Sequence, residues 1–247
     1  MFLFGSRDNL RLIGPVLNQP FHRRYQFNHA EAQHLFDLEA GGEAGVQRGD
    51  GFLEDHGDLA PDQLAPLVAA VGAHYGQIDI LLNCAGTNQR MPIAAVTPAV
   101  YNTIMDTNLR SAYFLSQAAL PLLIKAGGGK IVNVGSLTSA VGLADVSVYG
   151  MSKSALAQLT KTMAIEWALQ NIQVNCLCPG FIATELTAPL WQDPVRSRWM
   201  LDRILMKRAG QPDDLTGLAI MLSSRASDYI TGQSIYVDGG FTVGSQW

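Results

Sequence analysis

From about residue 57 onwards, short apolar segments alternate with longer segments of helical periodicity. Short apolar strands separated by helices are typical of a parallel sheet whose two faces are both covered. The pattern therefore predicts an α/β fold, a doubly wound parallel sheet in a single domain. The predicted strands are Ile78–Asn83, Lys130–Val134, Ile172–Leu177 and Ser234–Val237, and the predicted helices are residues 62–75, 98–124 (with Pro121 as a kink or boundary), 149–170 and 212–224.

Length and charge narrow the possible partners. The 247 residues suffice for one well-buried core. The net charge is −4 and Lys and Arg form no block, so no nucleic-acid partner is expected. No apolar run approaches the roughly 20 residues that span a bilayer, and Arg7 and Asp8 follow Met1 too soon for a signal peptide. We therefore expect a cytoplasmic protein without a membrane segment.

The chain has three cysteines, Cys84, Cys176 and Cys178. An odd, small number without framework spacing indicates reduced thiols in a reducing compartment. Cys176 and Cys178 are two residues apart in an apolar stretch, so on a strand their side chains share one face. A metal site would need more ligands, and four of the five histidines lie far upstream. We expect buried structural thiols and no metal.

Tyr149 and Lys153 are the first residues that suggest chemistry. They are four residues apart within a predicted helix, which places both side chains on one face, a turn apart. A nearby ammonium favours the phenolate form of tyrosine, and such a pair can exchange a proton with a substrate hydroxyl or carbonyl. The spacing alone is a weak signal, because an exposed tyrosine beside a solvated lysine has the same pattern.

The surroundings of this pair strengthen the interpretation. Ser136 follows the predicted strand that ends at Val134, and ligands bind at that end of parallel strands. Its hydroxyl could hold the reacting oxygen. Asn108 lies inside a predicted helix, where asparagine is disfavoured unless its amide has a role. Small residues after Asn83, ending at Gly86, would let a ligand approach the backbone.

Together these residues resemble the short-chain dehydrogenase/reductase family, whose members are single-domain Rossmann-like enzymes. The matching stretches occur in the family order and cover residues 57–247, about three quarters of the chain. They are Asp58-Leu59, Asn83-Cys-Ala-Gly86, Asn108, Ser136, Tyr149-x-x-x-Lys153, Val174-Asn175, Pro179-Gly180 with Thr184, Arg208-x-Gly210-x-Pro212 and Val237-Asp-Gly-Gly240. Two departures are mild: Cys84 stands where the family usually has asparagine, and Gly135 replaces a frequent serine.

The resemblance implies an NAD- or NADP-dependent oxidoreductase with assigned roles. Tyr149 would be the general acid and base, Lys153 would favour the phenolate and bind the nicotinamide ribose, and Ser136 would orient the substrate oxygen. Asn108 would support a water that relays protons to Lys153. The remaining cofactor-binding residues would be Asp58 and Leu59 at the adenine, Asn83, Ala85 and Gly86 at the adenosine, and Pro179, Gly180, Ile182 and Thr184 at the nicotinamide.

The first 56 residues depart from the family. Its members open with a strand and the motif T-G-x-x-x-G-x-G, whose backbone amides and following helix hold the pyrophosphate. We find no such motif near residues 5–25. The stretch Gly45-Val-Gln-Arg-Gly49-Asp-Gly51 has the glycine spacing, but no strand precedes it, Asp50 and Glu54 would face a phosphate, and it lies too close to Asn83. We interpret it as a chance match.

We therefore divide the chain into a divergent segment, residues 1–56, and a catalytic and cofactor-binding core, residues 57–247. A reading-frame error, a different start or splice product, and genuine divergence remain alternatives for the first segment. Without the phosphate-binding turn we expect the chain to bind NAD(P) weakly or not at all. The competing possibility is a diverged loop in which Arg7 or Arg11 replaces the backbone amides. The choice between NAD and NADP stays open, because the deciding residue would lie in this segment.

The substrate is a small molecule, and its class is only suggested. Several stretches resemble the sugar-acid and polyol branch, such as gluconate 5-dehydrogenase, and Arg90 could bind a substrate carboxylate, although a surface arginine is the competing interpretation. Ketone-specific carbonyl reductases and 3-ketoacyl carrier-protein reductases are further alternatives, as is a non-catalytic family member. The resemblance also implies a homo-oligomer, a tetramer or dimer, assembled through residues 98–124 and 149–170.

Overall fold

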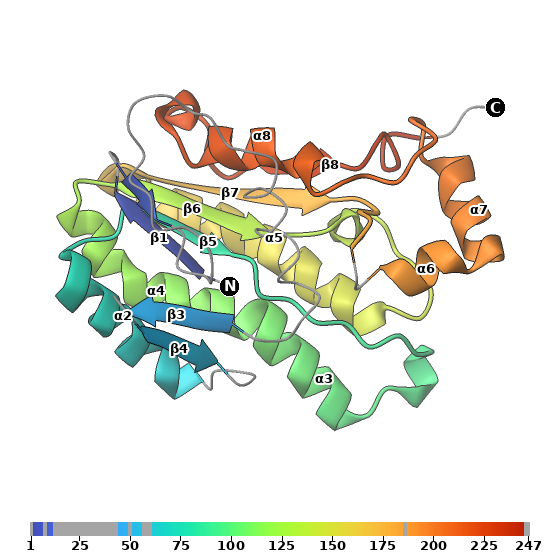
Figure 1. Cartoon of the computed structure of the whole chain (residues 1–247), viewed down its shortest axis with the longest axis horizontal. Coiled ribbons are helices and arrows are strands. Elements are labelled where there is room, and N and C mark those ends of the chain that lie inside the picture. Colours follow the sequence, from blue (N-terminus) through green and yellow to red (C-terminus); the bar gives the residue numbers. More distant parts are fainter. Residues whose placement is uncertain are drawn as a thin grey trace.

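The computed structural model describes residues 2–6, 9–11, 44–48, 51–55, 61–184 and 187–244 (Figure 1). Asp58 and Leu59, predicted to contact the adenine, lie outside these residues. The main sheet has six strands in the order β2-β1-β5-β6-β7-β8. The strands from β5 to β8 run parallel, as predicted. The bounds are β1 Phe2–Ser6, β2 Asn9–Arg11, β5 Ile80–Asn83, β6 Gly129–Val134, β7 Ile172–Pro179 and β8 Ser234–Val237.

Helices cover both faces of this sheet, which gives three layers (Figure 1). Every residue of β5 and β6 is buried, as expected for strands between two helical layers. One core contains Leu81 and Ile131 with side chains of α2, α4 and α5, and the other contains Leu82 and Val132 with side chains of α8. The predicted doubly wound α/β fold is confirmed. The helices are α2 Pro61–Tyr75, α3 Pro98–Met105, α4 Ser111–Lys125, α5 Ser147–Trp167 and α8 Asp213–Leu222.

The predicted helix 98–124 is divided differently from the expectation. A π-helical turn, Asp106–Arg110, separates α3 from α4 and contains the predicted site residue Asn108. Helix α4 runs through Pro121 to Lys125, so the boundary considered at Pro121 does not exist. Although proline removes a backbone donor, buried Leu115, Ala119 and Leu123 pack α4 against the sheet on both sides of it.

Two short helices were not predicted. They are α6, Ala188–Gln192, and α7, Pro194–Arg203, which follow the predicted nicotinamide loop. Asp193 begins α7, and its side chain accepts hydrogen bonds from the backbone of Val195 and Arg196 at 2.9 and 3.1 Å. An aspartate followed by proline is a recognised helix start, so this signal was present in the sequence.

The described part of the N-terminal segment differs from a βαβ unit. Strand β1 pairs antiparallel with both β2 and β5, whereas the first strand of a βαβ unit runs parallel to its partner. The two ends of the glycine-rich stretch belong to paired strands, because Gly45 lies in β3 (Ala44–Arg48) and Gly51 in its antiparallel partner β4 (Gly51–Asp55). A phosphate-binding turn leads into a helix instead. The prediction for the whole segment stays a prediction, since residues 12–43 lie outside the description.

Candidate active site

Helix α5 carries Tyr149 and Lys153 on one face. Lys153 is 1% exposed, and its Nζ lies 5.8 Å from the centroid of the Tyr149 ring. The ammonium donates a hydrogen bond of 2.8 Å to the carbonyl oxygen of Val134, at the end of β6. An ammonium is costly to bury, so a lysine in this position needs partners. The competing interpretation of a solvated surface lysine is therefore wrong.

Gly86 brings the loop after β5 into contact with this lysine. A Cβ atom added to Gly86 would lie 3.2 Å from Lys153 Nζ and 3.7 Å from Asn108 Oδ1. The backbone can pass so close only because glycine has no side chain. The structure thus brings Gly86, Asn108 and Lys153 together, although they are far apart in the sequence.

Asn108 holds the loop after Gly86 through three hydrogen bonds. Its Oδ1 accepts from the backbone N–H of Thr87 at 2.7 Å, and its Nδ2 donates to the carbonyl of Thr87 and to Ser152 Oγ, both at 3.0 Å. The side chain is buried within the π-helical turn, a feature that often occurs at functional sites. The amide of this mid-helix asparagine is thus fully engaged in holding the loop, and its part in a water relay stays a prediction.

Ser136 lies two residues after the end of β6 at Val134, whose carbonyl anchors Lys153. It is 7% exposed, and its Oγ accepts a hydrogen bond of 3.1 Å from the backbone N–H of Thr138. Its hydroxyl proton can therefore still be donated to a ligand oxygen. This position, at the carboxyl end of a central parallel strand, is the one predicted for a substrate-orienting group.

Asn83 is part of a buried polar network between the sheet and two helices. Its Nδ2 donates to Asn133 Oδ1 at 2.7 Å and to Ser116 Oγ at 3.0 Å, and Asn133 Nδ2 donates to Thr160 Oγ1 at 2.9 Å. The side chain thus ties β5 and β6 to α4 and α5. Any contact of this residue with a cofactor would fall to its backbone.

The loop after β7 carries the residues predicted to lie at the nicotinamide. Gly180 passes tightly over the end of β8, since a Cβ there would lie 2.5 Å from Asp238 Cα. Ile182 is buried and forms a parallel bridge to Gly210. Thr184 follows, and its backbone N–H donates to Thr187 Oγ1 at 3.0 Å. Gly210 of the Arg208 motif and Asp238 of the Val237 motif thus support this loop.

Arg90 lies in the electrostatic neighbourhood of Tyr149. Much of its surface is exposed, yet partial burial lowers the pKa of its guanidinium, and Arg196 of α7 lowers it further. Tyr149 and Asp145 act on this pKa in the opposite direction. The next residue, Met91, donates its backbone N–H to the carbonyl of Asp145 at 2.9 Å, which fixes the loop beside α5. Arg90 therefore lies among charged groups of both signs, with Arg196 and Asp145 both close enough to act on its pKa.

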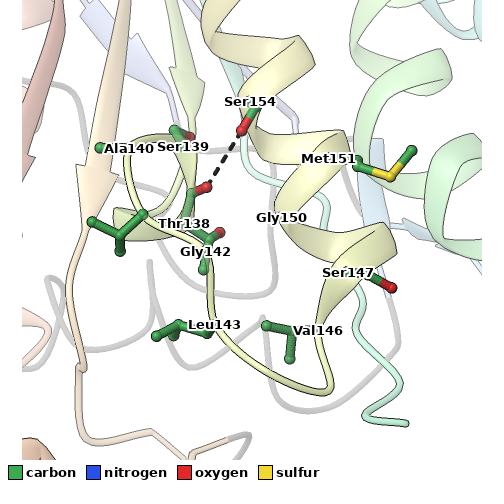
Figure 2. A pocket seen from close by; sticks show the side chains of 11 residues that line it. Thr138, Ser139, Ala140, Gly142, Leu143, Val146, Ser147, Gly150, Met151 and Ser154 are labelled. Carbon is green, nitrogen blue, oxygen red and sulfur yellow. Dashed lines mark hydrogen bonds between the residues drawn. The ribbon is translucent and has the colours of Figure 1, made fainter. Parts of the chain in front are cut away.

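A pocket of about 460 Å³ lies beside the site, between the loop after Ser136 and helix α5 (Figure 2). It borders the helix face of Ser147, Gly150 and Ser154, whereas Tyr149 and Lys153 lie on another face. Ser154 Oγ donates a hydrogen bond of 3.3 Å to the carbonyl of Thr138 and closes one end of it.

The nicotinamide end of a dinucleotide fits these residues. Within the described part of the chain, the carbonyl of Val134 is the only hydrogen-bond acceptor of Lys153 Nζ. An ammonium has three donors, so two remain for hydroxyl oxygens such as those of a ribose. Glycine at position 86 leaves open the space next to Lys153 Nζ, which the Cβ of any other residue type at this position would fill. The described residues show no comparable fit at the pyrophosphate end.

Comparison with known proteins identifies the family. The family model described as enoyl-(acyl carrier protein) reductase matches residues 58–242, which include Asn108, Ser136, Tyr149 and Lys153. The chain belongs to the short-chain dehydrogenase/reductase family. The predicted membership is confirmed, and with it the predicted class of enzyme, an NAD(P)-dependent oxidoreductase.

Several relatives show where in the family the chain stands. A tropinone reductase homolog of Arabidopsis thaliana is 43% identical over 183 residues, 74% of this chain and 69% of that protein. The gluconate 5-dehydrogenase of Gluconobacter oxydans is 37% identical over 216 residues, 87% of this chain and 84% of that one. The crystal structure of a gluconate 5-dehydrogenase from Burkholderia cenocepacia, in complex with NADP and tartrate, has a TM-score of 0.73 at 38% identity and covers 75% of this chain and 72% of that chain.

Three positioning residues of this site were not predicted. Thr87 and Ser152 hold Asn108, and Ser139 Oγ donates a hydrogen bond of 2.9 Å to the carbonyl of Lys153. Ser152 directly precedes Lys153, so its closeness to the site could have been noticed. The partners of Thr87 and Ser139 depend on tertiary packing, which no local pattern reveals.

The described helices give no sign of a membrane segment, since none of them is both long and apolar enough to cross a bilayer.

Proposed function

We propose that this short-chain dehydrogenase/reductase transfers a hydride between NAD or NADP and a secondary alcohol or ketone of a sugar acid. The observation that carries the proposal is the buried ammonium of Lys153, anchored to Val134 and placed beside the Tyr149 ring. Such a pair suits proton exchange with a substrate oxygen. The similarity to gluconate 5-dehydrogenases supports the sugar-acid class.

In the reductive direction, the Tyr149 hydroxyl donates its proton to the substrate carbonyl oxygen, and in the oxidative direction the phenolate removes the hydroxyl proton. When bound, the nicotinamide supplies or accepts the hydride. Ser136 donates a hydrogen bond to the same substrate oxygen and fixes its distance from Tyr149. Lys153 stabilises the phenolate by its charge, and Asn108 keeps the loop at Gly86 in place above Lys153.

The cofactor would be held by several parts of the site. Lys153 would donate to the ribose hydroxyls, and the backbone of Asn83, Ala85 and Gly86 would face the adenosine side. Pro179, Gly180, Ile182 and Thr184 would hold the nicotinamide end. Asp58 and Leu59, outside the described residues, stay candidates for the adenine. This assignment follows the match of these positions to the family motif.

Arg90 would bind the substrate carboxylate. A guanidinium can hold both oxygens of a carboxylate at once, and Arg90 lies close enough to Tyr149 for the tyrosine to act on the pKa of the guanidinium. If so, Arg90→Gln raises the KM for 5-keto-D-gluconate by roughly tenfold or more, the cost of losing one or two charged hydrogen bonds. Its KM for a neutral ketone stays unchanged.

The proposed activity is tested by steady-state assays of the 247-residue chain with NADPH and NADH. The panel contains 5-keto-D-gluconate, a neutral cyclic ketone and a 3-ketoacyl thioester. A kcat/KM highest for the sugar acid is the expected result. Preference for the ketone would support the carbonyl-reductase alternative, to which the Arabidopsis relative is similar, and preference for the thioester would support a ketoacyl reductase.

A second candidate is a family member with impaired cofactor binding. Two observations favour it: β1 pairs antiparallel with β5, and the ends of the glycine-rich stretch lie in the paired strands β3 and β4. Calorimetric titration of the full chain with NADPH and NADH separates the two. Micromolar binding of either would support the enzyme and would show that a phosphate site exists in the N-terminal segment; no heat of binding would support the second candidate.

We also propose a homo-oligomer in which α4 and α5 meet their counterparts. Both helices cover the same face of the sheet (Figure 1) and carry large apolar side chains on the exposed side. Examples are Phe114 and Ile124 on α4 and Ile165 on α5, with Leu169 just beyond it.

All three cysteines are buried thiols, which supports a reducing location such as the cytoplasm.

A further inference from the structure

The thiols of Cys176 and Cys178 form a contact pair inside the protein. Both side chains are fully buried on the same face of β7, and their sulfurs are 3.6 Å apart. They cluster with Ala157 of α5 and with Tyr236 of β8. The hydrogen bond between the thiols, together with burial, raises the pKa of Cys176. The same hydrogen bond lowers the pKa of Cys178. The two thiols thus pack as a compact pair between the sheet and α5.

Gly135 lies against both sulfurs. A Cβ atom at this position would be 2.7 Å from Cys176 Sγ and 2.7 Å from Cys178 Sγ, closer than real side chains approach. Gly135 is not among the glycines with a positive φ, so the position does not need glycine for its backbone conformation. Glycine is needed here because the two sulfurs leave no room for a side chain.

The residues next to Gly135 belong to the proposed catalytic machinery. The preceding residue, Val134, supplies the carbonyl that accepts from Lys153 Nζ, and the following residue is Ser136. The Cys178 thiol also contacts the backbone N–H of Ser136 and the hydroxyl of Ser139. That hydroxyl in turn donates to the carbonyl of Lys153. The thiol pair therefore touches the supports of both Ser136 and Lys153.

We propose that Cys176 and Cys178 are positioning residues for the reaction: by filling the space behind Gly135, they fix the end of β6 and so set Ser136 and the Lys153 anchor relative to Tyr149. The inference rests on the proposed function. It assigns to the two thiols a steric role that depends on glycine at position 135. A side chain at position 135 and the two sulfurs exclude each other.

The test is a set of complementary variants. Gly135→Ala should lower kcat by about 10–100-fold with little change in KM, because a displacement of about 1 Å at the reacting groups has this effect. Adding Cys176→Ala and Cys178→Ala to Gly135→Ala removes the sulfurs that the new Cβ meets. The Cys176→Ala/Cys178→Ala variant, which leaves the space behind Gly135 empty, should itself have a lower kcat than the wild type, and the triple variant should regain kcat to within a few fold of it; a wild-type kcat in the Cys176→Ala/Cys178→Ala variant would overturn the positioning role. Gly217→Ala in α8, where a Cβ meets nothing within 4 Å, is the matched control and should keep wild-type kcat.

A second readout does not depend on turnover. Thiol labelling of the native protein, located by mass spectrometry, should be slow at Cys176 and Cys178 in the wild type and in Gly217→Ala, and faster in Gly135→Ala. Wild-type kcat in Gly135→Ala, or a triple variant as impaired as Gly135→Ala, would overturn the inference. If the chain turns over no substrate, the proposed function fails, and unchanged labelling in Gly135→Ala would still overturn the steric coupling on its own.

Discussion

At the scale of single residues, the site depends on how closely the backbone at Gly86 approaches Lys153. The gap leaves room for hydrogen but not comfortably for a methyl group, because a Cβ would lie 3.2 Å from Nζ. Gly86→Ala should therefore push the ammonium or the loop by a few tenths of an ångström. We expect kcat/KM to fall by about tenfold, with cofactor affinity reduced as well. Steady-state kinetics measure the first and NADPH titration the second; wild-type values in both would mean that the loop moves freely.

The sequence predicted this residue set but not its connections. The four-residue spacing of Tyr149 and Lys153 placed both on one helix face, and this holds in the structure. The spacing could not show that Lys153 is buried or that Val134 anchors it, because that contact joins elements 19 residues apart. The shared face of Cys176 and Cys178 was predicted from strand geometry alone. Their contact with Gly135 required the neighbouring strand.

At the scale of elements, the π-helical turn between α3 and α4 depends on Asn108. Its buried amide makes three hydrogen bonds, to the backbone of Thr87 and to Ser152. Asn108→Ala leaves these groups unsatisfied, and we expect the free energy of unfolding to decrease by about 1–3 kcal/mol. Urea denaturation followed by circular dichroism measures this change. An unchanged midpoint would show that the turn is held by other contacts.

The start of α8 contains an ion pair with a defined pH dependence. Hydrogen bonds from Arg208, at 2.6 and 2.8 Å, lower the pKa of Asp214, and the backbone N–H of Gln211 adds to this effect. Because the pKa of Asp214 is lower in the folded state than in the unfolded state, the ion pair stabilises the protein at pH values above the ordinary pKa of a carboxyl group. This stabilisation disappears as the pH falls through the lowered pKa of the folded state. Because the pair is exposed, the contribution is small.

Asp214→Asn should therefore lower the thermal midpoint slightly at neutral pH. The difference from the wild type should vanish at pH values below the lowered pKa, where Asp214 is protonated in both states. Thermal unfolding measured across the acid range decides this. A difference that persists unchanged at the lowest pH would assign the effect to packing instead of charge.

The elements predicted from periodicity were largely correct, and the errors have physical causes. Strands β5 to β8 were predicted, together with their parallel direction, because each is a short apolar run between helices. The π-turn was missed because it needs only one extra residue per turn, which leaves the helical periodicity almost unchanged. Helix α7 was missed because four of its ten residues are charged and its apolar content is low, although Asp193 and Pro194 mark its start.

At the scale of the whole molecule, the exposed face of α5 predicts assembly. Ile165 is 80% exposed, and Leu169, four residues later and just past the end of α5, is 98% exposed. Burying such side chains against a second copy would recover hydrophobic free energy. Light scattering of the purified chain should give a dimer or tetramer mass, and Ile165→Glu should shift it towards the monomer. A wild-type chain that is already monomeric would contradict this proposal.

The N-terminal segment sets the limit of what the sequence could predict for the whole chain. The sequence showed that the family's glycine motif is absent, and the antiparallel pairing of β1 with β5 agrees with an N-terminal segment that differs from the family's βαβ unit. The groups that would hold the pyrophosphate could not be identified from the sequence, because no motif in this segment accompanies the candidates Arg7 and Arg11. The core from residue 61 onwards was predictable because its motifs and its periodicity agree.

The most direct test of the account compares the wild-type chain with Tyr149→Phe at saturating cofactor and 5-keto-D-gluconate. Phenylalanine keeps the ring beside Lys153 and removes only the hydroxyl that exchanges the proton. The account predicts that kcat falls by about 10²–10⁴-fold while the thermal midpoint and the affinity for NADPH stay close to those of the wild type. A Tyr149→Phe variant that turns over at a near-normal rate would contradict the assignment of Tyr149 as the proton donor.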